Sequence, residues 1–387
     1  MKILIVLTYY RPHTSGLTIY AERLAKALVR RGHQVTVLTS HYEKHLPYEE
    51  NQEGVHILRV PVLFRLSKGV IMPTFGWTAN RLVLEHDAIH LHLPQFDAAG
   101  VALRGRLLGK PTVITYHCDL RMPPGLLSWV ANQAVHLMDN LAALFTHRII
   151  TYTRDYGENS PFLRRYLHKL TVIQPPVELP TISEETVKDF ASLNNPQNYR
   201  PVIGMAARFA TEKGVEVLLE AMPVILQQYP NALVYFAGSY QGIIGEEEYL
   251  QRLSPIIKRY EEDGNWRFLG NLNPDQMACF YRNIDVLVLP SLNSTESFGL
   301  VQIEAMINGK PVVASDLPGV RQPITMHQMG KIVPIGDSTA LGQALIDILK
   351  QPSLYIRDAE PIRERYLPES VAVEYEKLFE TLKNEIR

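Results

Sequence analysis

Residues 285–315, "DVLVLPSLNSTESFGLVQIEAMINGKPVVAS", hold two short Val- and Leu-rich runs on either side of a polar loop and a segment of helical period. The runs 285–290 and 311–315 predict buried parallel strands, and the segment between them predicts a helix that begins near Gly299 and ends before Gly309. Ligands of open parallel sheets bind beyond the carboxyl ends of the strands. The stretch therefore predicts a βαβ unit with a binding loop at 291–298.

Two glutamates flank the start of the predicted helix, Glu296 on the loop and Glu304 about one and a half turns into the helix. Gly299 lets a ligand approach the backbone, where unpaired N–H groups favour an anion such as phosphate. Two carboxylates would repel a phosphate unless they bind something else, and sugar hydroxyls on either side of a diphosphate meet that need. The pair predicts a nucleotide-sugar site; the alternative is a solvated loop Glu296 and an exposed helical Glu304.

The same alternation of apolar runs and helical segments continues along the whole chain. Further predicted strands are 2–7, 34–39, 55–60, 88–93, 111–117, 148–153, 170–176, 202–207, 232–238, 266–270 and 330–334. Predicted helices are 17–31, 214–228, 246–262, 300–308 and 338–350. Nearly continuous Val/Ile/Leu strands between helices are typical of parallel sheets covered on both faces, so the fold class is α/β. Two such series predict two doubly wound domains.

A polar, proline-containing segment divides the two series. We therefore predict a first domain over 1–176, a linker over 177–200 and a second domain over 201–366. The last stretch, 367–387, has a helical pattern that does not say which domain it packs on.

Composition sets limits on class and location. The chain has 387 residues, 46% of them hydrophobic and 20% charged, which is globular and long enough for two domains. The short apolar start predicts a strand and no signal peptide, and no stretch predicts a transmembrane helix. Cys118 and Cys279 form no zinc pattern and indicate no disulfide framework, so a reducing cytoplasmic location is expected.

Charge is unevenly distributed between the two halves. Residues 1–180 hold 20 Lys and Arg against 13 Asp and Glu, and residues 181–387 hold 19 against 27. Two interpretations stay open. Either the surfaces of the two halves evolved separately, or the first half meets an anionic partner such as a phosphorylated acceptor or a membrane surface.

A second candidate motif, "GMAARFATEKG" at 204–214, lies where a strand leads into a helix. It places Arg208 and Lys213 at the same sheet edge as Glu296, where a guanidinium and an ammonium suit a diphosphate. The stretch does not have the order of a P-loop, and no G-x-G-x-x-G opens either half. The alternative is a pair of surface cations bridged to Glu212 or Glu216.

Two residues of the first half are further candidates. Gly16 lies in the loop and helix start after the first strand, where it either permits close approach of an anion or simply makes the turn. His117 ends a predicted strand, where it either contacts a sugar hydroxyl or a developing positive charge, or is tied to the backbone.

Together these residues resemble the retaining glycosyltransferases of glycosyltransferase family 4. The resemblance covers nearly the whole chain and is strongest over 202–320, in "AARFATEKG", "FLGNLNPDQMACFYRNIDVLVLPS" and "ESFGLVQIEAMINGKPVVASDLPGV". It implies a GT-B fold, in which two Rossmann-like domains face each other across a cleft. The second domain would bind the nucleotide-sugar and the first the acceptor, and the helix 367–387 would cross back to the first.

The resemblance also implies roles for individual residues. It makes His117, Glu296, Arg208 and Lys213 the catalytic set, with His117 near the anomeric carbon, Glu296 on the sugar hydroxyls and the two cations on the diphosphate. It places Glu304 near the ribose, and it assigns the remaining donor contacts to Gly16, Phe298, Gly299, Leu300, Gly270 and Asn271. One departure is Ser15, which stands beside Gly16 where the family often has a second glycine.

The implied function is transfer of a hexose from a UDP- or GDP-sugar to an acceptor hydroxyl with retention of configuration, in glycan, glycolipid or cell-envelope polysaccharide synthesis. The acceptor would be a sugar, a glycan or a lipid-linked molecule, with no nucleic acid involved. No D-x-D sequence is present, so we expect metal-independent transfer without a cofactor. The double displacement that would give retention needs a nucleophilic carboxylate, and the sequence nominates none.

The sequence leaves several alternative functions open. They are another GT-B enzyme such as an epimerase or a phosphorylase, a binding module without catalysis, and a metal-dependent hydrolase that uses His90 and His92 together with His86 and His117.

Segment 124–146 is apolar with interspersed polar residues. It predicts either a helix that covers the core or peripheral association with the inner face of a membrane.

Overall fold

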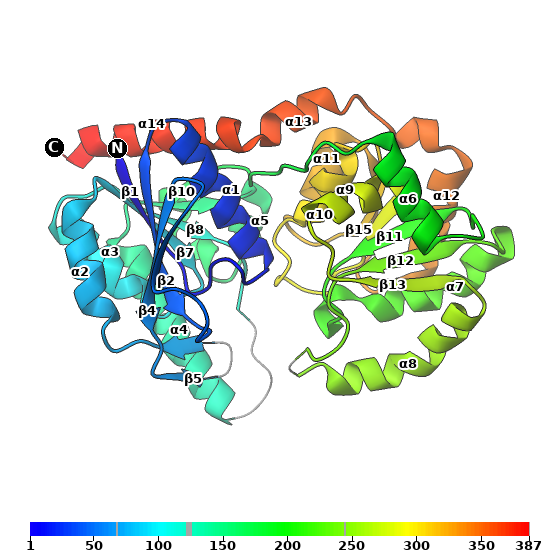
Figure 1. Ribbon diagram of the computed structural model, residues 1–387, viewed down its shortest axis with the longest axis horizontal. Coiled ribbons are helices and arrows are strands. Elements are labelled where there is room, and N and C mark those ends of the chain that lie inside the picture. Colours follow the sequence, from blue (N-terminus) through cyan, green and yellow to red (C-terminus); the bar gives the residue numbers. More distant parts are fainter. Residues whose placement is uncertain (67–68, 121–125, 244, 387) are drawn as a thin grey trace. The chain divides into compact units, whose positions relative to one another are not determined.

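The computed structural model describes residues 1–66, 69–120, 126–243 and 245–386, with side chains except those of 66 and 126–131 (Figure 1). The chain forms two compact units. The first contains Met1–Val177 and Arg365–Arg387, and the second contains Glu178–Glu364. Each unit is built on its own mainly parallel sheet with helices on both faces, so the fold class is α/β.

The first unit has an eight-stranded sheet in the order β10-β9-β8-β7-β1-β2-β4-β3. All neighbours pair in parallel except β3 and β4. Because β2 and β7 lie on opposite sides of β1, the strand order reverses there, which is where doubly wound sheets bind ligands. The strands are β1 (Lys2–Val6), β2 (Gln34–His41), β3 (Glu49–Gln52), β4 (Val55–Pro61), β7 (Ala88–Leu93), β8 (Thr112–Tyr116), β9 (Arg148–Thr151) and β10 (Leu170–Val172).

Helices cover both faces of this sheet. On one face α2 and α3 pack over a core that includes Ile89 and Leu91 of β7. On the other face α1 contacts α14, and the ring of Tyr375 of α14 packs in a tilted arrangement against His90 of β7. The helices are α1 (Gly16–Arg30), α2 (Phe75–Glu85), α3 (Ala98–Leu107), α4 (Leu126–Phe145), α5 (Arg154–Asn159) and α14 (Pro368–Ile386), with 3₁₀ turns η1 (Leu163–Arg165) and η2 (Leu167–Lys169) and a hairpin of β5 (Phe64–Leu66) and β6 (Gly69–Ile71).

The second unit has a six-stranded, fully parallel sheet in the order β13-β12-β11-β14-β15-β16. The chain builds outward from β11 to one side, then returns to β14 on its other side. The strand order therefore reverses between β11 and β14. The strands are β11 (Val202–Ala206), β12 (Leu233–Ala237), β13 (Trp266–Gly270), β14 (Val286–Leu289), β15 (Val312–Ser315) and β16 (Gly330–Val333).

Packing on the two faces of the second sheet explains why its strands are apolar throughout. Buried residues of α7, α8 and α12 form one core with Val234, Val288 and Val313. On the opposite face, Phe280 and Ile284 at the end of α9 lie against Gly204 of β11, where a Cβ would overlap them. The helices are α6 (Glu184–Asn194), α7 (Val215–Gln228), α8 (Glu247–Glu262), α9 (Pro274–Asn283), α10 (Leu300–Met306), α11 (Gln322–His327), α12 (Ser338–Lys350) and α13 (Glu360–Tyr366), with 3₁₀ turns η3 (Thr211–Lys213) and η4 (Pro352–Tyr355).

The structure differs from the sequence-based expectation in several elements. Segment 177–200, expected as a linker, contains α6, which packs on α9 and belongs to the second unit. The strands β3, β5 and β6 were not expected, and β3 runs antiparallel to β4. Of segment 124–146, residues 124 and 125 lie outside the described residues, and Leu126–Phe145 form α4, whose Asp139, Ala142 and Ala143 are buried.

Within the described ranges, no helix combines the length and the apolar character that crossing a membrane requires.

Candidate functional site

The centre of the candidate site in the second unit is a contact between the loops that follow β11 and β14. Lys213 is the last residue of η3, and Glu296 lies on the loop before α10. Lys213 Nζ donates to Glu296 Oε2 at 2.7 Å, and each side chain is 17% exposed. A backbone hydrogen bond of 2.9 Å from Leu292 N to Glu212 O joins the same two loops. The sheet therefore brings together, at its switch point, two charged residues 83 positions apart.

Glycine is required where these loops meet. Gly214, with φ 67°, follows Lys213, and a Cβ there would overlap the carbonyl oxygen of Pro290 at the end of β14. Gly299, with φ 78°, precedes α10, and a Cβ there would overlap the side chain of Leu289. Both left-handed conformations suit glycine alone, because other residues carry a steric cost there. Gly214 lets the cationic loop approach the end of β14, and Gly299 lets the start of α10 lie against Leu289.

Arg208 lies just beyond the end of β11. Its guanidinium pairs with Glu212 across one turn, and its side chain remains 42% exposed. The alternative reading of the motif, a pair of surface cations bridged to Glu212 or Glu216, includes this ion pair. Lys213 makes neither bridge, because it pairs with Glu296, while Glu216 accepts a hydrogen bond from the Tyr249 hydroxyl. Arg208 and Lys213 are thus cations on the same loop, each held by a carboxylate.

Glu304 is a buried residue of α10, with 7% of its surface exposed. The Tyr281 hydroxyl of α9 donates to Glu304 Oε2 at 2.7 Å. The alternative of an exposed helical glutamate is therefore wrong. Of the residues expected to line the sugar, Phe298 is buried in the protein interior, and Leu300 begins α10.

The loops after β12 and β13 lie at the same edge of the sheet. Gly238 N donates to Gly270 O at 2.8 Å, and Ser239 Oγ donates to Asn271 Oδ1 at 2.7 Å. Gly270 has φ 69°, and apart from its chain neighbours no atom in the part of the chain that the structure describes lies within 4 Å of the position where a Cβ would stand, so it leaves open space there. The expected donor residues Gly270 and Asn271 are thus placed beside the loop after β12.

Some polar residues at this edge were not expected from the sequence. Glu246, at the start of α8, accepts hydrogen bonds from Thr211 N at 2.9 Å and Thr211 Oγ1 at 2.8 Å. A cavity of about 230 Å³ beside it is lined by residues that include Phe209, Tyr240 and Glu246. The sequence could have indicated Ser239, because it directly follows the predicted strand 232–238. Glu246 lies too far from the end of any predicted strand for the sequence to indicate it.

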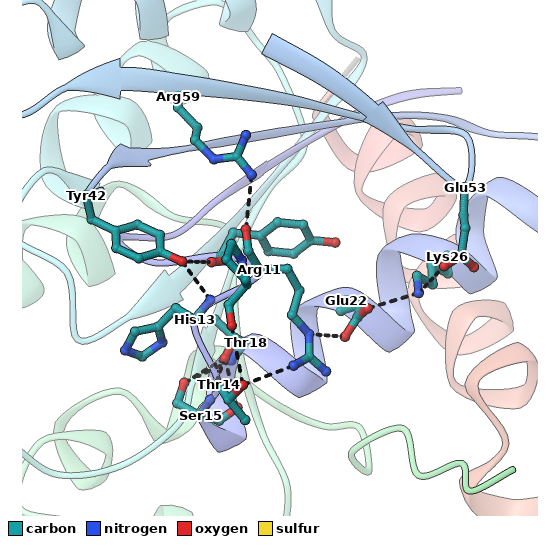
Figure 2. Close-up of polar contacts among 12 residues, drawn as sticks. Arg11, His13, Thr14, Ser15, Thr18, Glu22, Lys26, Tyr42, Glu53 and Arg59 are labelled. Atoms are coloured by element: carbon teal, nitrogen blue, oxygen red, sulfur yellow. Dashed lines mark hydrogen bonds and ion pairs between the residues drawn. The ribbon is translucent and has the colours of Figure 1, made fainter. Parts of the chain in front are cut away.

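In the first unit, Gly16 is the first residue of α1, and the loop before it is held from several sides (Figure 2). Ser15 caps the helix: Thr18 N donates to Ser15 Oγ at 3.2 Å, and Ser15 N donates to Thr18 Oγ1 at 2.7 Å. Arg59 Nη2 of β4 donates to Arg11 O at 3.0 Å, and His13 N donates to the Tyr42 hydroxyl at 2.6 Å. Ser15 thus has a structural use in the position where a second glycine was expected.

Gly16 is not required by the turn. Its φ is not in the left-handed region, and among the described residues no atom outside its chain neighbours and its own helix backbone lies within 4 Å of the position where its Cβ would stand. The interpretation of Gly16 as a turn glycine is therefore wrong. The backbone at Gly16 has open space in front of it, which is what close approach of a ligand would need.

His117 directly follows β8 and is 7% exposed. Its Nε2 lies 2.8 Å from His92 Nδ1, and its Nδ1 lies 2.5 Å from the Tyr152 hydroxyl. Burial, with a smaller contribution from His92, lowers the pKa of His117 well below its usual value. The ring is therefore neutral near pH 7, and side chains occupy both of its nitrogens.

The alternative of a zinc hydrolase finds no support. The ring nitrogens of His86 lie 2.6 Å from Leu82 O and 2.9 Å from Thr36 Oγ1. His86 precedes β7 and His117 follows the parallel strand β8, so the two histidines lie at opposite edges of the sheet. Among residues 1–66, 69–120, 126–243 and 245–386, no three or more His, Cys, Asp or Glu side chains are grouped to hold a metal ion.

Two parallel-sheet units of this kind, the second with paired cations and glutamates at its switch point, define a glycosyltransferase of the GT-B class. Residues 188–365 match the family model of glycosyl transferases group 1, and residues 14–180 match that of glycosyltransferase family 4. The chain belongs to family 4, and it is a glycosyltransferase.

Individual proteins show the same likeness. An uncharacterized glycosyltransferase of Methanocaldococcus jannaschii is 30% identical over 86% of this chain and 84% of its own length. A phosphatidyl-myo-inositol mannosyltransferase of Mycobacterium leprae is 26% identical over 99% of this chain and 97% of its own. In fold, HepE of Anabaena, solved with UDP and glucose, gives a TM-score of 0.75 at 19% identity over 98% of this chain and 100% of its own.

Proposed function

We propose that this glycosyltransferase transfers a hexose from a nucleoside diphosphate sugar to an acceptor hydroxyl with retention of configuration and without a metal ion. The observation that carries the proposal is the Lys213–Glu296 contact at the β11/β14 switch point, with Arg208 on the same loop. A diphosphate binds cations, and carboxylates bind the hydroxyls of a sugar. Lys213 and Glu296 supply one group of each kind, and a hydrogen bond joins the two.

The charges suggest how donor binding proceeds. Lys213 and Arg208 are each neutralised by a carboxylate in the protein alone. A bound diphosphate offers stronger, doubly charged partners, so Lys213 would turn to the phosphate oxygens and Glu296 would turn to the sugar hydroxyls. Such an exchange keeps every partly buried charge paired before and after binding, which avoids the cost of an isolated buried ion.

The proposed reaction is an attack on the same face that the leaving group departs from. The bond between the anomeric carbon and the diphosphate oxygen breaks, and the acceptor oxygen bonds to that carbon. The acceptor proton passes to the departing diphosphate. Lys213 and Arg208 stabilise the negative charge that grows on the diphosphate, and Glu296 stabilises the positive charge on the sugar ring.

The acceptor is proposed to be a hydroxyl carried by a lipid headgroup or a glycan. Curated relatives named phosphatidyl-myo-inositol mannosyltransferases align over nearly the full chain and favour a lipid-linked polyol. The excess of Lys and Arg over Asp and Glu in residues 1–180 suits an anionic acceptor or lipid surface.

The proposal is tested with a panel of UDP-, GDP- and ADP-sugars. A donor that binds the native state raises the apparent melting temperature by mass action. We expect one nucleotide class to stabilise the chain, and we expect NMR of the product formed from that donor to show an unchanged anomeric configuration. An inverted product would rule out retention, and no stabilisation by any member of the panel would count against the donor class.

Transfer is expected to continue in excess chelator. Lys213, which pairs with Glu296, and Arg208 on the same loop take the place of a bridging metal on the diphosphate, so EDTA should change the initial rate less than ~2-fold. The measurement is the rate of product formation before and after chelation, followed by addition of Mg²⁺ or Mn²⁺. Complete loss of activity that only a divalent metal restores would reject metal independence.

Replacing Gly16 by alanine is expected to separate stability from activity. The added methyl group meets open space and restricts the unfolded chain, so stability should stay equal or rise by about 0.4–1 kcal/mol. If a phosphate approaches this backbone, the methyl group displaces it, and turnover should fall at least ~10-fold.

Gly76→Ala is the matched control for this substitution. Gly76 is also near the start of a helix, and a Cβ there would meet Arg104 at an ordinary 3.5 Å. It should leave turnover unchanged. Thermal melts and initial rates of both variants decide the point; a fully active Gly16→Ala enzyme would remove Gly16 from the site.

A further inference from the structure

The segment that carries Lys213 is hydrogen-bonded on both sides to the start of α8. On one side, Glu246 Oε2 accepts from Thr211 N at 2.9 Å and from Thr211 Oγ1 at 2.8 Å. On the other side, the Tyr249 hydroxyl donates to Glu216 Oε2 and accepts from Glu216 N at 3.3 Å. We call Glu246 and Tyr249 the anchor pair. They are three positions apart, so both side chains leave α8 on the same side.

The 3₁₀ turn η3, which contains Lys213, is short and depends on contacts from outside it. It has three residues, and the hydrogen bonds of so tight a turn have poor geometry. Its own backbone bonds run from Lys213 N to Ala210 O at 2.9 Å and from Gly214 N to Thr211 O at 3.2 Å. Thr211 is exposed, so water competes for its polar groups. The bonds from Thr211 to Glu246 therefore add a tie that the turn cannot supply itself.

Tyr249 also supports the cationic loop from the protein interior. Its ring packs in a tilted arrangement against Phe209, with 5.3 Å between the ring centroids. Phe209 is fully buried and directly follows Arg208. The anchor pair therefore contacts the chain next to both cations. Tyr249 packs on the residue after Arg208, and Glu246 bonds to the residue two positions before Lys213.

The proposed exchange of partners at donor binding explains what the anchor pair is for. Lys213 Nζ is tied to Glu296 Oε2 at 2.7 Å, and this bond breaks when Lys213 turns to the diphosphate. The bonds between Thr211 and Glu246 join two groups that take no part in the exchange, so they persist. A functional side chain must be held within ~0.5 Å of its productive geometry by such supporting bonds. The anchor pair thus keeps η3 in place while Lys213 changes partner.

We propose that Glu246, through Thr211, is a positioning residue for Arg208 and Lys213, the two cations assigned to the diphosphate. The inference rests on the proposed function, which gives those cations that role. Glu246 itself does not touch the donor. It accepts the N–H and O–H groups of Thr211 and thereby fixes η3 against α8. Its contribution depends on the acceptor oxygen and not on the charge, so a neutral side chain with the same acceptor should replace it.

Two substitutions of Glu246 separate its geometry from its charge. Glu246→Gln keeps a carbonyl oxygen that can accept both hydrogen bonds from Thr211, whereas Glu246→Ala removes the acceptor. Because a misplacement of about 1 Å can cost ~100-fold in rate, we expect the alanine variant to lose at least ~10-fold in kcat. The glutamine variant should stay within ~2-fold of the wild-type kcat. An equal loss in both variants would show that the charge matters, and would overturn the positioning role.

Two further variants control for general damage and test the same contact from its other side. Glu248→Ala removes an exposed glutamate of the first turn of α8 and should leave kcat unchanged. Thr211→Val keeps the shape of the side chain and removes the O–H donor, while the N–H donor stays. It should lower kcat less than Glu246→Ala does, and it should cause no further loss when added to Glu246→Ala. A further loss in that double variant would contradict the inference, because Thr211 would then act without Glu246.

A double variant with Lys213 distinguishes positioning from loss of stability. If Glu246 acts through the cationic loop, Glu246→Ala should cost at most ~3-fold in kcat when Lys213→Ala is already present. A general structural defect would lower kcat by the same factor in both backgrounds, and that result would overturn the positioning role. Wild-type kcat in a Glu246→Ala enzyme whose thermal melt shows it folded would overturn it as well. Absence of sugar transfer by the wild-type chain would instead overturn the proposed function, so the two failures are distinguishable.

Discussion

Replacing Lys213 by alanine is expected to lower turnover at least ~100-fold, in line with loss of one preorganised electrostatic stabiliser. Lys213 Nζ lies 2.7 Å from Glu296 Oε2 in a partly buried position, so its charge is only weakly screened. Negative charge on the diphosphate grows as the glycosidic bond breaks. The lysine should therefore bind the transition state more tightly than the donor, and kcat should fall more than donor affinity does.

Steady-state kinetics on the donor identified by the panel measures this effect. Lys258→Ala is the matched control, since Lys258 is a 76% exposed lysine on α8 that only reaches Glu262 at 3.9 Å. It should retain wild-type kcat, because an exposed pair of this kind contributes little. A melt of Lys213→Ala distinguishes lost chemistry from lost folding. A folded Lys213→Ala enzyme with near-wild-type kcat would defeat the assignment of the diphosphate site.

The core strands of both sheets could be located from the sequence because their residues are apolar on both faces. The run 285–290 contains β14, and the run 202–207 contains β11. The strand β3, "EENQ", gave no such signal: it lies at the sheet edge, is polar and mostly exposed, and owes its extended form to pairing with β4. A pattern of buried residues predicts only those strands that are buried.

The same limit applies to α6. The segment 177–200 is polar, and Val187 is the one buried residue of α6, so its hydrophobic pattern is weak. Its packing on α9 also depends on side-chain hydrogen bonds such as that from Asn283 Nδ2 to Val187 O at 3.1 Å. Contacts between residues this far apart in the chain do not show in a local pattern.

For the site, the sequence predicted residue types and their shared sheet edge, but not their pairing. That Lys213 meets Glu296, while Arg208 meets Glu212, follows from the β11/β14 register and from the close approach that Gly214 permits. The burial of Glu304 beneath the Tyr281 hydroxyl, and the bond between His92 and His117, are likewise products of tertiary packing. The residue pattern of one segment does not show which residue of another segment a side chain will contact.

Replacing Glu296 by alanine is expected to lower turnover at least ~100-fold, and replacing it by glutamine should cost nearly as much. Glutamine keeps the size of the side chain and an acceptor for Lys213 or a sugar hydroxyl, but it has no charge to stabilise a positive sugar ring. If Glu296 only held Lys213 in place by a hydrogen bond, glutamine would restore most of the rate. The comparison of the two variants therefore separates the electrostatic role from the positional one.

The double variant Lys213→Ala/Glu296→Ala sharpens this test. Residues that act as one unit lose less together than the sum of their single losses. We expect the combined loss in kcat to fall well short of the product of the two single effects, because each single variant also leaves a partly buried charge without its partner. Glu262→Gln, an exposed glutamate of α8, serves as the control and should leave kcat unchanged. Full multiplicativity of the two losses would mean that Lys213 and Glu296 act independently, and would contradict a shared site at the β11/β14 switch point.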